Sequence, residues 1–120
     1  MTTTTAPIPH AILRFEQDTG SGSLASSYSA DVLTKIESVL LTLASTPTDA
    51  EDFRVFLDDA GGSTKDTTAF ALDLASGSVP YAAFLPEGLY VKPGDALGLT
   101  FTNSGSLAFA ATTIMKEITA

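Results

Sequence analysis

The densest group of side chains that could do chemistry lies in the acidic segment Asp58–Asp66. Asp58, Asp59 and Asp66 surround a turn at residues 61–63, and carboxylate and carbonyl oxygens on a glycine-bent loop suit calcium. The spacing differs from that of an EF-hand loop, which needs oxygens at alternate positions and a closing glutamate. The other interpretation is an acidic turn exposed to solvent, so the sequence leaves open whether Asp58–Asp66 binds calcium.

Residues for catalysis are scarce. His10 is the only histidine, so a Ser-His-Asp triad would need it, yet the chain has no Gly-x-Ser-x-Gly elbow. With no cysteine, the chain has no thiol nucleophile, disulfide or cysteine-ligated zinc site. Neither a P-loop nor a dinucleotide-binding fingerprint is present. We therefore expect a protein that is not an enzyme and needs no cofactor.

Three tyrosines, Tyr28, Tyr81 and Tyr90, could form a sugar-binding face, because aromatic rings stack on pyranose rings. Tryptophan, the usual anchor of such sites, is absent. The alternative places Tyr81 and Tyr90 as half-buried strand residues.

The charge balance limits the possible partners. Fourteen acidic and six basic residues give a net charge of −8, which repels phosphate backbones and predicts no nucleic-acid partner. No apolar run approaches the ~18 residues of a membrane span, so no membrane partner is expected. No secretory signal follows Met1, and we expect synthesis in a host cytoplasm.

Period-two alternation predicts an all-β fold. Leu97, Leu99 and Phe101 alternate with smaller residues after a Pro93-Gly94 turn, and residues 103–105 are expected to close a hairpin. Residues 19–23, with residues 26 and 27, are assigned to a flexible Gly/Ser loop. The predicted strands are residues 10–16, 53–57, 70–74, 81–84, 89–91, 97–101 and, as one long strand or two short ones, 106–118. Together they indicate one antiparallel, jelly-roll-like β-sandwich of about eight short strands, spanning residues 10–120.

Asp31–Ala44 fits two patterns. Four positions fit a helical stripe: Val32, Ile36, Val39 or Leu40, and Leu43. Thr34-x-x-Glu37 resembles a capping box. Alternation from residue 37 to residue 43 instead predicts a strand over Ile36–Ala44, which we favour because the neighbouring segments are β-rich.

Residues 1–9 predict an extended N-terminal arm ahead of the sandwich, because each proline pushes the preceding residue toward extended geometry. The alternative is a loose terminus. The arm residues expected to contact neighbouring subunits are Thr2, Thr3, Thr4, Thr5, Pro7, Ile8 and Pro9.

Four segments resemble small β-sandwich virion proteins of tailed bacteriophages, such as head decoration, head–tail connector or tail components. The segments are residues 36–43, 53–58, 89–97 and 100–103. The resemblance implies a non-enzymatic structural subunit located in the virion. Its expected partners are copies of itself, as a homo-oligomer, and other virion proteins. The alternative function is a glycan- or cell-surface-binding β module.

The arm hypothesis predicts the effect of deleting Thr2–Pro9. The segment is uncharged and stiffened by two prolines, so it loses less entropy on docking than a Gly/Ser linker would. Truncation should leave the thermal stability of the isolated protein almost unchanged and weaken its attachment to particles in a sedimentation assay. Equal particle occupancy of the truncated and full-length chains would contradict the hypothesis.

Overall fold

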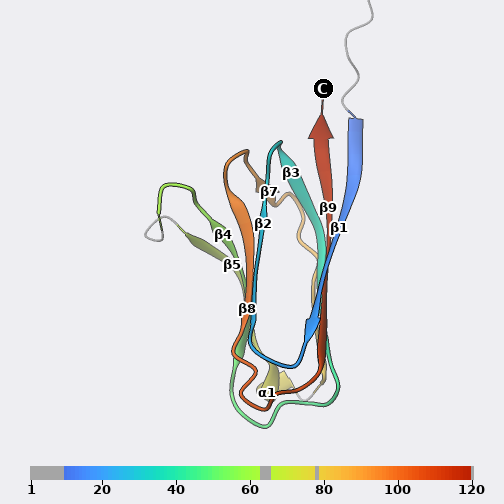
Figure 1. The fold of residues 1–120 in the computed structure, drawn as a ribbon, viewed down its shortest axis with the longest axis vertical. Coiled ribbons are helices and arrows are strands. Elements are labelled where there is room, and N and C mark those ends of the chain that lie inside the picture. Colours follow the sequence, from blue (N-terminus) through green and yellow to red (C-terminus); the bar gives the residue numbers. More distant parts are fainter. Residues whose placement is uncertain (1–9, 63–65, 78, 120) are drawn as a thin grey trace, which may run out of the picture.

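The chain folds into two antiparallel β-sheets packed face to face (Figure 1). The computed structural model describes residues 10–62, 66–77 and 79–119. One sheet, called the β1 sheet, has the order β1-β9-β3-β6, with β7 also paired to β3. Its strands are β1 (His10–Gly20), β9 (Phe109–Thr119), β3 (Thr34–Leu43), β6 (Tyr81–Phe84) and β7 (Tyr90–Val91).

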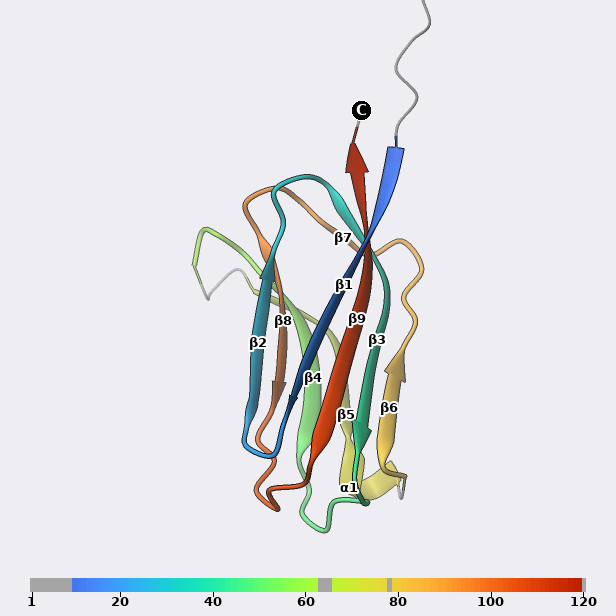
Figure 2. The same ribbon diagram turned by 45° about the vertical axis from the view of Figure 1, so that its right-hand side comes forward.

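The second sheet, called the β2 sheet, has the order β2-β8-β4-β5. Its strands are β2 (Leu24–Ser29), β8 (Ala96–Phe101), β4 (Asp52–Asp58) and β5 (Thr67–Asp73). A single helical turn, α1 (Leu74–Gly77), follows β5 at one end of the sandwich. Figure 1 shows the two sheets edge-on as separate layers, and in Figure 2 β1 and β9 of one sheet lie in front of β4 and β5 of the other.

The order of pairing along the chain is that of a jelly roll. Apart from the two-residue β7, the strands pair from the ends of the sequence inward: β1 with β9, β2 with β8, β3 with β6, and β4 with β5. Successive pairs fall in alternate sheets, as expected when a long folded ribbon rolls up on itself. The predicted antiparallel, jelly-roll-like sandwich is therefore confirmed.

The core lies between the two sheets and consists of the inward-facing residues of each strand. Phe53, Val55, Leu97 and Leu99 have no exposed surface, and Phe101 is 1% exposed. Their alternation in sequence matches the period of two that a strand imposes on its faces. The expected burial of one face of residues 97–101 is confirmed.

Within the ambiguous segment Asp31–Ala44, residues Thr34–Leu43 form strand β3, so the strand prediction is confirmed and the helical alternative is wrong. The helix-like spacing has a physical cause. The register with β9 shifts between Ile36 and Ser38, so Glu37 is an extra residue in a β-bulge. Ile36 and Val39, three positions apart, are consequently both fully buried, as on a helix face.

Two local predictions are wrong. Ser26 and Ser27 belong to β2, and Thr19 and Gly20 to β1, and not to a loop, because pairing with β8 and with β9 overrides the turn preference of serine and glycine. Residues 103–105 do not close a hairpin, since β8 and β9 belong to different sheets. The chain passes from one sheet to the other between β8 and β9. Asn103 lies in this connection, where it has a positive φ of 56° and is 4% exposed.

A glycine in β8 is covered by an aromatic ring on the outer surface of the β2 sheet. Gly98 lies directly opposite Phe56 of β4, and a Cβ at residue 98 would collide with the ring. The guanidinium of Arg54 lies 4.3 Å from the centre of the same ring. Arg54, Phe56 and Gly98 thus form a stack in which the ring replaces the side chain that the glycine lacks.

The core assignment predicts different costs for two neighbouring substitutions in β8. Phe101→Ala should lower the free energy of unfolding by ~3–5 kcal/mol, the transfer term plus the unfilled cavity. Thr100→Ala, on the outer face, should cost less than about 1 kcal/mol. Denaturant unfolding of both variants measures the difference, and equal losses would mean that the two faces of β8 are exchanged.

Candidate functional site

The predicted contact residues of the arm, Thr2 to Pro9, lie outside the described part of the chain. Their contacts with neighbouring subunits therefore stay a prediction. The candidate sites below are built from the described residues.

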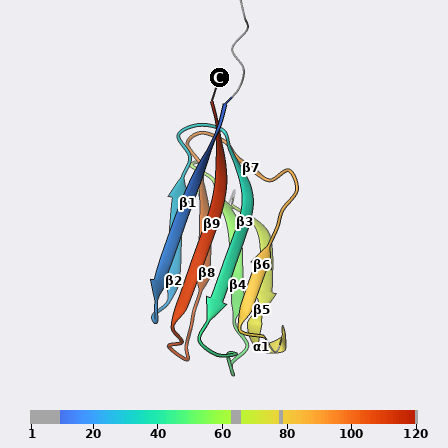
Figure 3. The ribbon, with the colours of Figure 1, turned by 90° about the vertical axis from the view of Figure 1, so that its right-hand side faces the viewer.

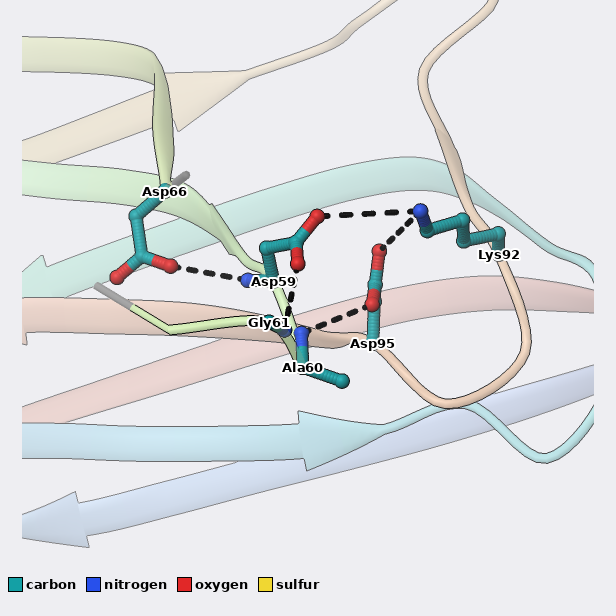
Figure 4. A network of polar contacts seen from close by, with 6 residues as sticks. All are labelled: Asp59, Ala60, Gly61, Asp66, Lys92 and Asp95. Atoms are coloured by element: carbon teal, nitrogen blue, oxygen red, sulfur yellow. Dashed lines mark hydrogen bonds and ion pairs between the residues drawn. The ribbon is translucent and has the colours of Figure 1, made fainter. Parts of the chain in front are cut away.

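The acidic segment Asp58–Asp66 forms a polar network with the turn that precedes β8 (Figure 4). The Asp66 carboxylate accepts a hydrogen bond from the Asp59 amide at 2.9 Å, and the Asp59 carboxylate accepts one from the Gly61 amide at 2.6 Å. The Asp95 carboxylate accepts a third from the Ala60 amide at 3.0 Å. These carboxylates close the loop by satisfying its backbone donors.

One lysine links the two acidic turns. The ammonium of Lys92 lies 3.8 Å from Asp59 and 3.7 Å from Asp95 (Figure 4). Lys92 and Asp95 belong to the predicted Pro-Gly turn, in which the Asp95 amide donates to the Lys92 carbonyl and Gly94 has a φ of 92°. No group of three or more metal-ligating side chains is placed to hold a metal ion within residues 10–62, 66–77 and 79–119.

The opposite end of the sandwich carries a second set of carboxylates that bind backbone amides. The Asp73 carboxylate accepts from the amides of Glu51 and Ala75, and the Glu51 carboxylate accepts from the Ser104 amide at 2.8 Å. Glu51 and Asp73 also line an open groove of 550 Å³ with Arg54. Carboxylates held in this way fix loop ends to the strands beside them.

The three tyrosines do not form one binding face. Tyr28 packs against the core, and its burial raises the pKa of the hydroxyl. Tyr81 and Tyr90 are exposed, but they lie opposite Thr42 and Lys35 of β3, respectively. Seven positions along a strand span about 23 Å, which is too far for both rings to stack on one sugar.

Strands β1, β9, β3 and β6 lie side by side in the β1 sheet (Figure 3). The outer face of this sheet carries two rows of uncharged side chains that cross all four strands. We call these rows the uncharged face. The first row is Gln17, Thr112, Leu40 and Ala83, and the second is Thr19, Ala110, Thr42 and Tyr81, in the order β1, β9, β3, β6. None of the twenty charged residues of the chain belongs to either row.

Large apolar side chains are exposed on the uncharged face and next to it. Leu40 is 38% exposed, Tyr81 54% and Phe15, which follows on from the first row in β1, 62%. A patch of exposed apolar side chains on one face of a soluble protein is typical of an interaction surface.

A compensated group of charges borders the uncharged face. Lys35 of β3 lies directly opposite Lys116 of β9, a pairing of like charges that is unfavourable by itself. The carboxylate of Glu37, the bulged residue, lies 3.6 Å from the Lys35 ammonium and 3.7 Å from that of Lys116. The bulge therefore places an anion between the two cations.

The sequence gives no direct signal for the uncharged face. Its residues come from four strands that are far apart in the chain, and only their registers bring them into rows. Leu13 and Phe15 alternate with the charged residues Arg14 and Glu16 in the sequence, but alternation alone does not tell which side of a strand faces the core. Within the described residues, no helix is long and apolar enough to cross a membrane.

No protein-family model matches the chain, and no curated protein is similar to it. The structure is similar to the crystal structure of PliG from Aeromonas hydrophila, a periplasmic lysozyme inhibitor of g-type lysozyme. The similarity covers 98% of this chain and 93% of that chain, with 9% sequence identity and a TM-score of 0.34. A TM-score this low assigns neither a family nor a function.

The polar network predicts unequal roles for Asp95 and Lys92. Asp95→Ala removes the acceptor of the Ala60 amide, which is exposed and can then bind water, and should cost about 0.5–1.5 kcal/mol of unfolding free energy. Lys92→Ala removes only ion pairs of a side chain that is 67% exposed and should cost under about 0.5 kcal/mol. Thermal or urea unfolding compares them, and equal costs would mean that the ion pairs hold the loops together.

Proposed function

We propose that this protein is a non-enzymatic structural subunit of a bacteriophage particle. It acts in the virion through contacts with copies of itself and with other virion proteins. The uncharged face of the β1 sheet is the observation that carries the proposal.

Charge explains why such a face suits close packing. A net charge of −8 opposes the approach of identical subunits, so a contact must keep carboxylates away from its centre. The rows through Leu40 and Thr42 meet this condition, since the nearest charged group on the same face is the compensated set around Glu37. Apolar area at this contact supplies the driving force for association.

The fold and the arm agree with the same role. Jelly rolls occur in viral capsid proteins, although they also occur in lectins, so the fold alone does not decide between them. The resemblance of residues 36–43 and 89–97 to phage virion proteins favours the particle. In this proposal Thr2–Pro9 reaches a neighbouring subunit and adds to the contact made by the uncharged face. The glycan-binding alternative has less support because Tyr28 packs against the core and Tyr81 and Tyr90 lie about 23 Å apart.

A charge placed in the uncharged face tests the proposal. Leu40→Lys alters an exposed side chain and should change the free energy of unfolding by under about 1 kcal/mol. It should reduce incorporation into particles at least roughly tenfold, because the contact would desolvate an unpaired ammonium. Particles are purified by sedimentation, and the ratio of subunit to major particle protein is measured by quantitative mass spectrometry.

Ala25→Lys is the matched control, since it adds the same charge to an exposed position on the β2 sheet. Ala25→Lys should be incorporated like the wild type. Equal incorporation of both variants would show that the uncharged face is not the contact. Absence of the wild-type protein from particles, together with saturable binding on a glycan array, would replace the proposal by the glycan-binding alternative.

A further inference from the structure

The outer edge of β1 is open. β1 pairs with β9 at all eleven of its residues and has no neighbour on its other side among the described strands (Figure 3). Natural edge strands are usually short or protected by proline, lysine, a bulge or inward-pointing charges. β1 is eleven residues long, contains neither proline nor lysine, and keeps an unbroken register with β9. Its inward-pointing charges, Arg14, Glu16 and Asp18, are of both signs, so they do not repel every partner strand. An edge of this kind can pair with another strand.

Exposed apolar side chains are concentrated on this strand. Eight large hydrophobic residues are exposed in the described part of the chain, and three of them lie within four positions of β1. They are Ile12 at 55%, Leu13 at 53% and Phe15 at 62%. Pairing with a second strand would stabilise such a strand in two ways, through backbone hydrogen bonds at its open edge and through burial of its apolar side chains.

The charges of β1 identify the partner. Arg14, Glu16 and Asp18 share the face of β1 that points toward β2, where Arg14 contacts Glu16 at 3.0 Å and donates to the Ser29 carbonyl at 2.7 Å. Asp18 accepts a hydrogen bond from Ser26. The charges around Phe15 are therefore self-complementary, with a cation one position before it and an anion one position after it.

We propose that two copies of the chain pair through their β1 edges, antiparallel, about a two-fold axis at Phe15. This deepens the proposed function, on which it rests, by naming one contact between subunits. The pairing places Arg14 opposite Glu16 of the second copy, and Phe15 opposite its own equivalent. It joins the two β1 sheets into one and brings their uncharged faces side by side.

The other two-fold registers are less favourable. Directly opposed residues share a face of the sheet, so a two-fold axis between identical antiparallel strands must pass through a residue pair. An axis at Arg14 opposes two arginines, and an axis at Glu16 opposes two glutamates. An axis at Gln17 opposes Glu16 to Asp18, and an axis at Leu13 leaves Arg14 without an opposite charge. Only the axis at Phe15 pairs Arg14 with Glu16 and opposes no like charges.

Charge reversal tests the pairing in the full-length chain. Arg14→Glu and Glu16→Arg each create like-charge contacts in both halves of the symmetric interface, and each should raise the dimer Kd at least roughly tenfold. The double variant restores opposite charges and should return the Kd to within about threefold of the wild type. Sedimentation velocity over a concentration series gives the Kd. A monomeric wild type, or a double variant as weak as the single ones, would overturn the proposal.

Cross-linking tests the register, because the chain has no native cysteine. Phe15→Cys should form a disulfide-linked dimer under mild oxidation, since its Cα lies opposite its own equivalent, within the ~7 Å limit for a disulfide. Leu13→Cys should not cross-link with itself, because four positions separate the two sulfurs by about 13 Å along the strands. It should cross-link with Gln17→Cys in a mixture of the two variants. Efficient self-cross-linking at residue 13 would overturn the register.

The outcomes separate this inference from the proposed function. If the protein is incorporated into particles but does not form this dimer, the β1 pairing is wrong and the proposed structural role stands. If the protein forms the dimer but is absent from particles, the structural role is wrong and the β1 pairing stands.

Discussion

The register of β9 is the constraint on which the rest of the structure depends. β9 pairs with β1 along its whole length and with β3 on its other side, so it fixes both neighbours at once. Ala111 and Met115 point into the core, while Thr112 and Ile114 point outward beside β1 and β3. A shift of one residue would exchange these sets and place polar residues in the core and apolar residues outside. Core packing and the uncharged outer surface are therefore two results of one pairing.

Carboxylates contribute to this arrangement mainly at the ends of the sandwich. Asp59, Asp66 and Asp95 bind backbone amides at one end, and Glu51 and Asp73 do so at the other. These acidic side chains thus stabilise the loops by accepting hydrogen bonds from backbone amides that would otherwise lack partners. It also keeps a large share of the negative charge away from the middle of the β1 sheet. Asp59 and Asp66, two of the residues that suggested a cation site in the sequence, act as acceptors for the chain's own backbone.

Much of the fold follows from the sequence, because its signals are local. Alternation at Leu97, Leu99 and Phe101 identifies a strand and its buried face, and Gly94 supplies the positive φ of the turn before it. The bulge at Glu37 makes the strand look like a helix in the sequence, since one extra residue changes the spacing of buried positions from two to three. Ser26 and Ser27 form a strand only because β8 lies beside them. The rows of the uncharged face depend on three registers, and the arm residues Thr2–Pro9 lie outside the described structure.

The stack of Arg54, Phe56 and Gly98 limits how this protein can vary. The ring of Phe56 occupies the space that a side chain at residue 98 would need, so the two positions share one volume. A larger residue at position 98 fits only if the ring of Phe56 moves aside or is lost, and loss of the ring alone leaves an uncovered glycine in the strand. The side chains that positions 56 and 98 tolerate therefore depend on each other. Arg54 has a similar dependence, because its guanidinium rests on the same ring.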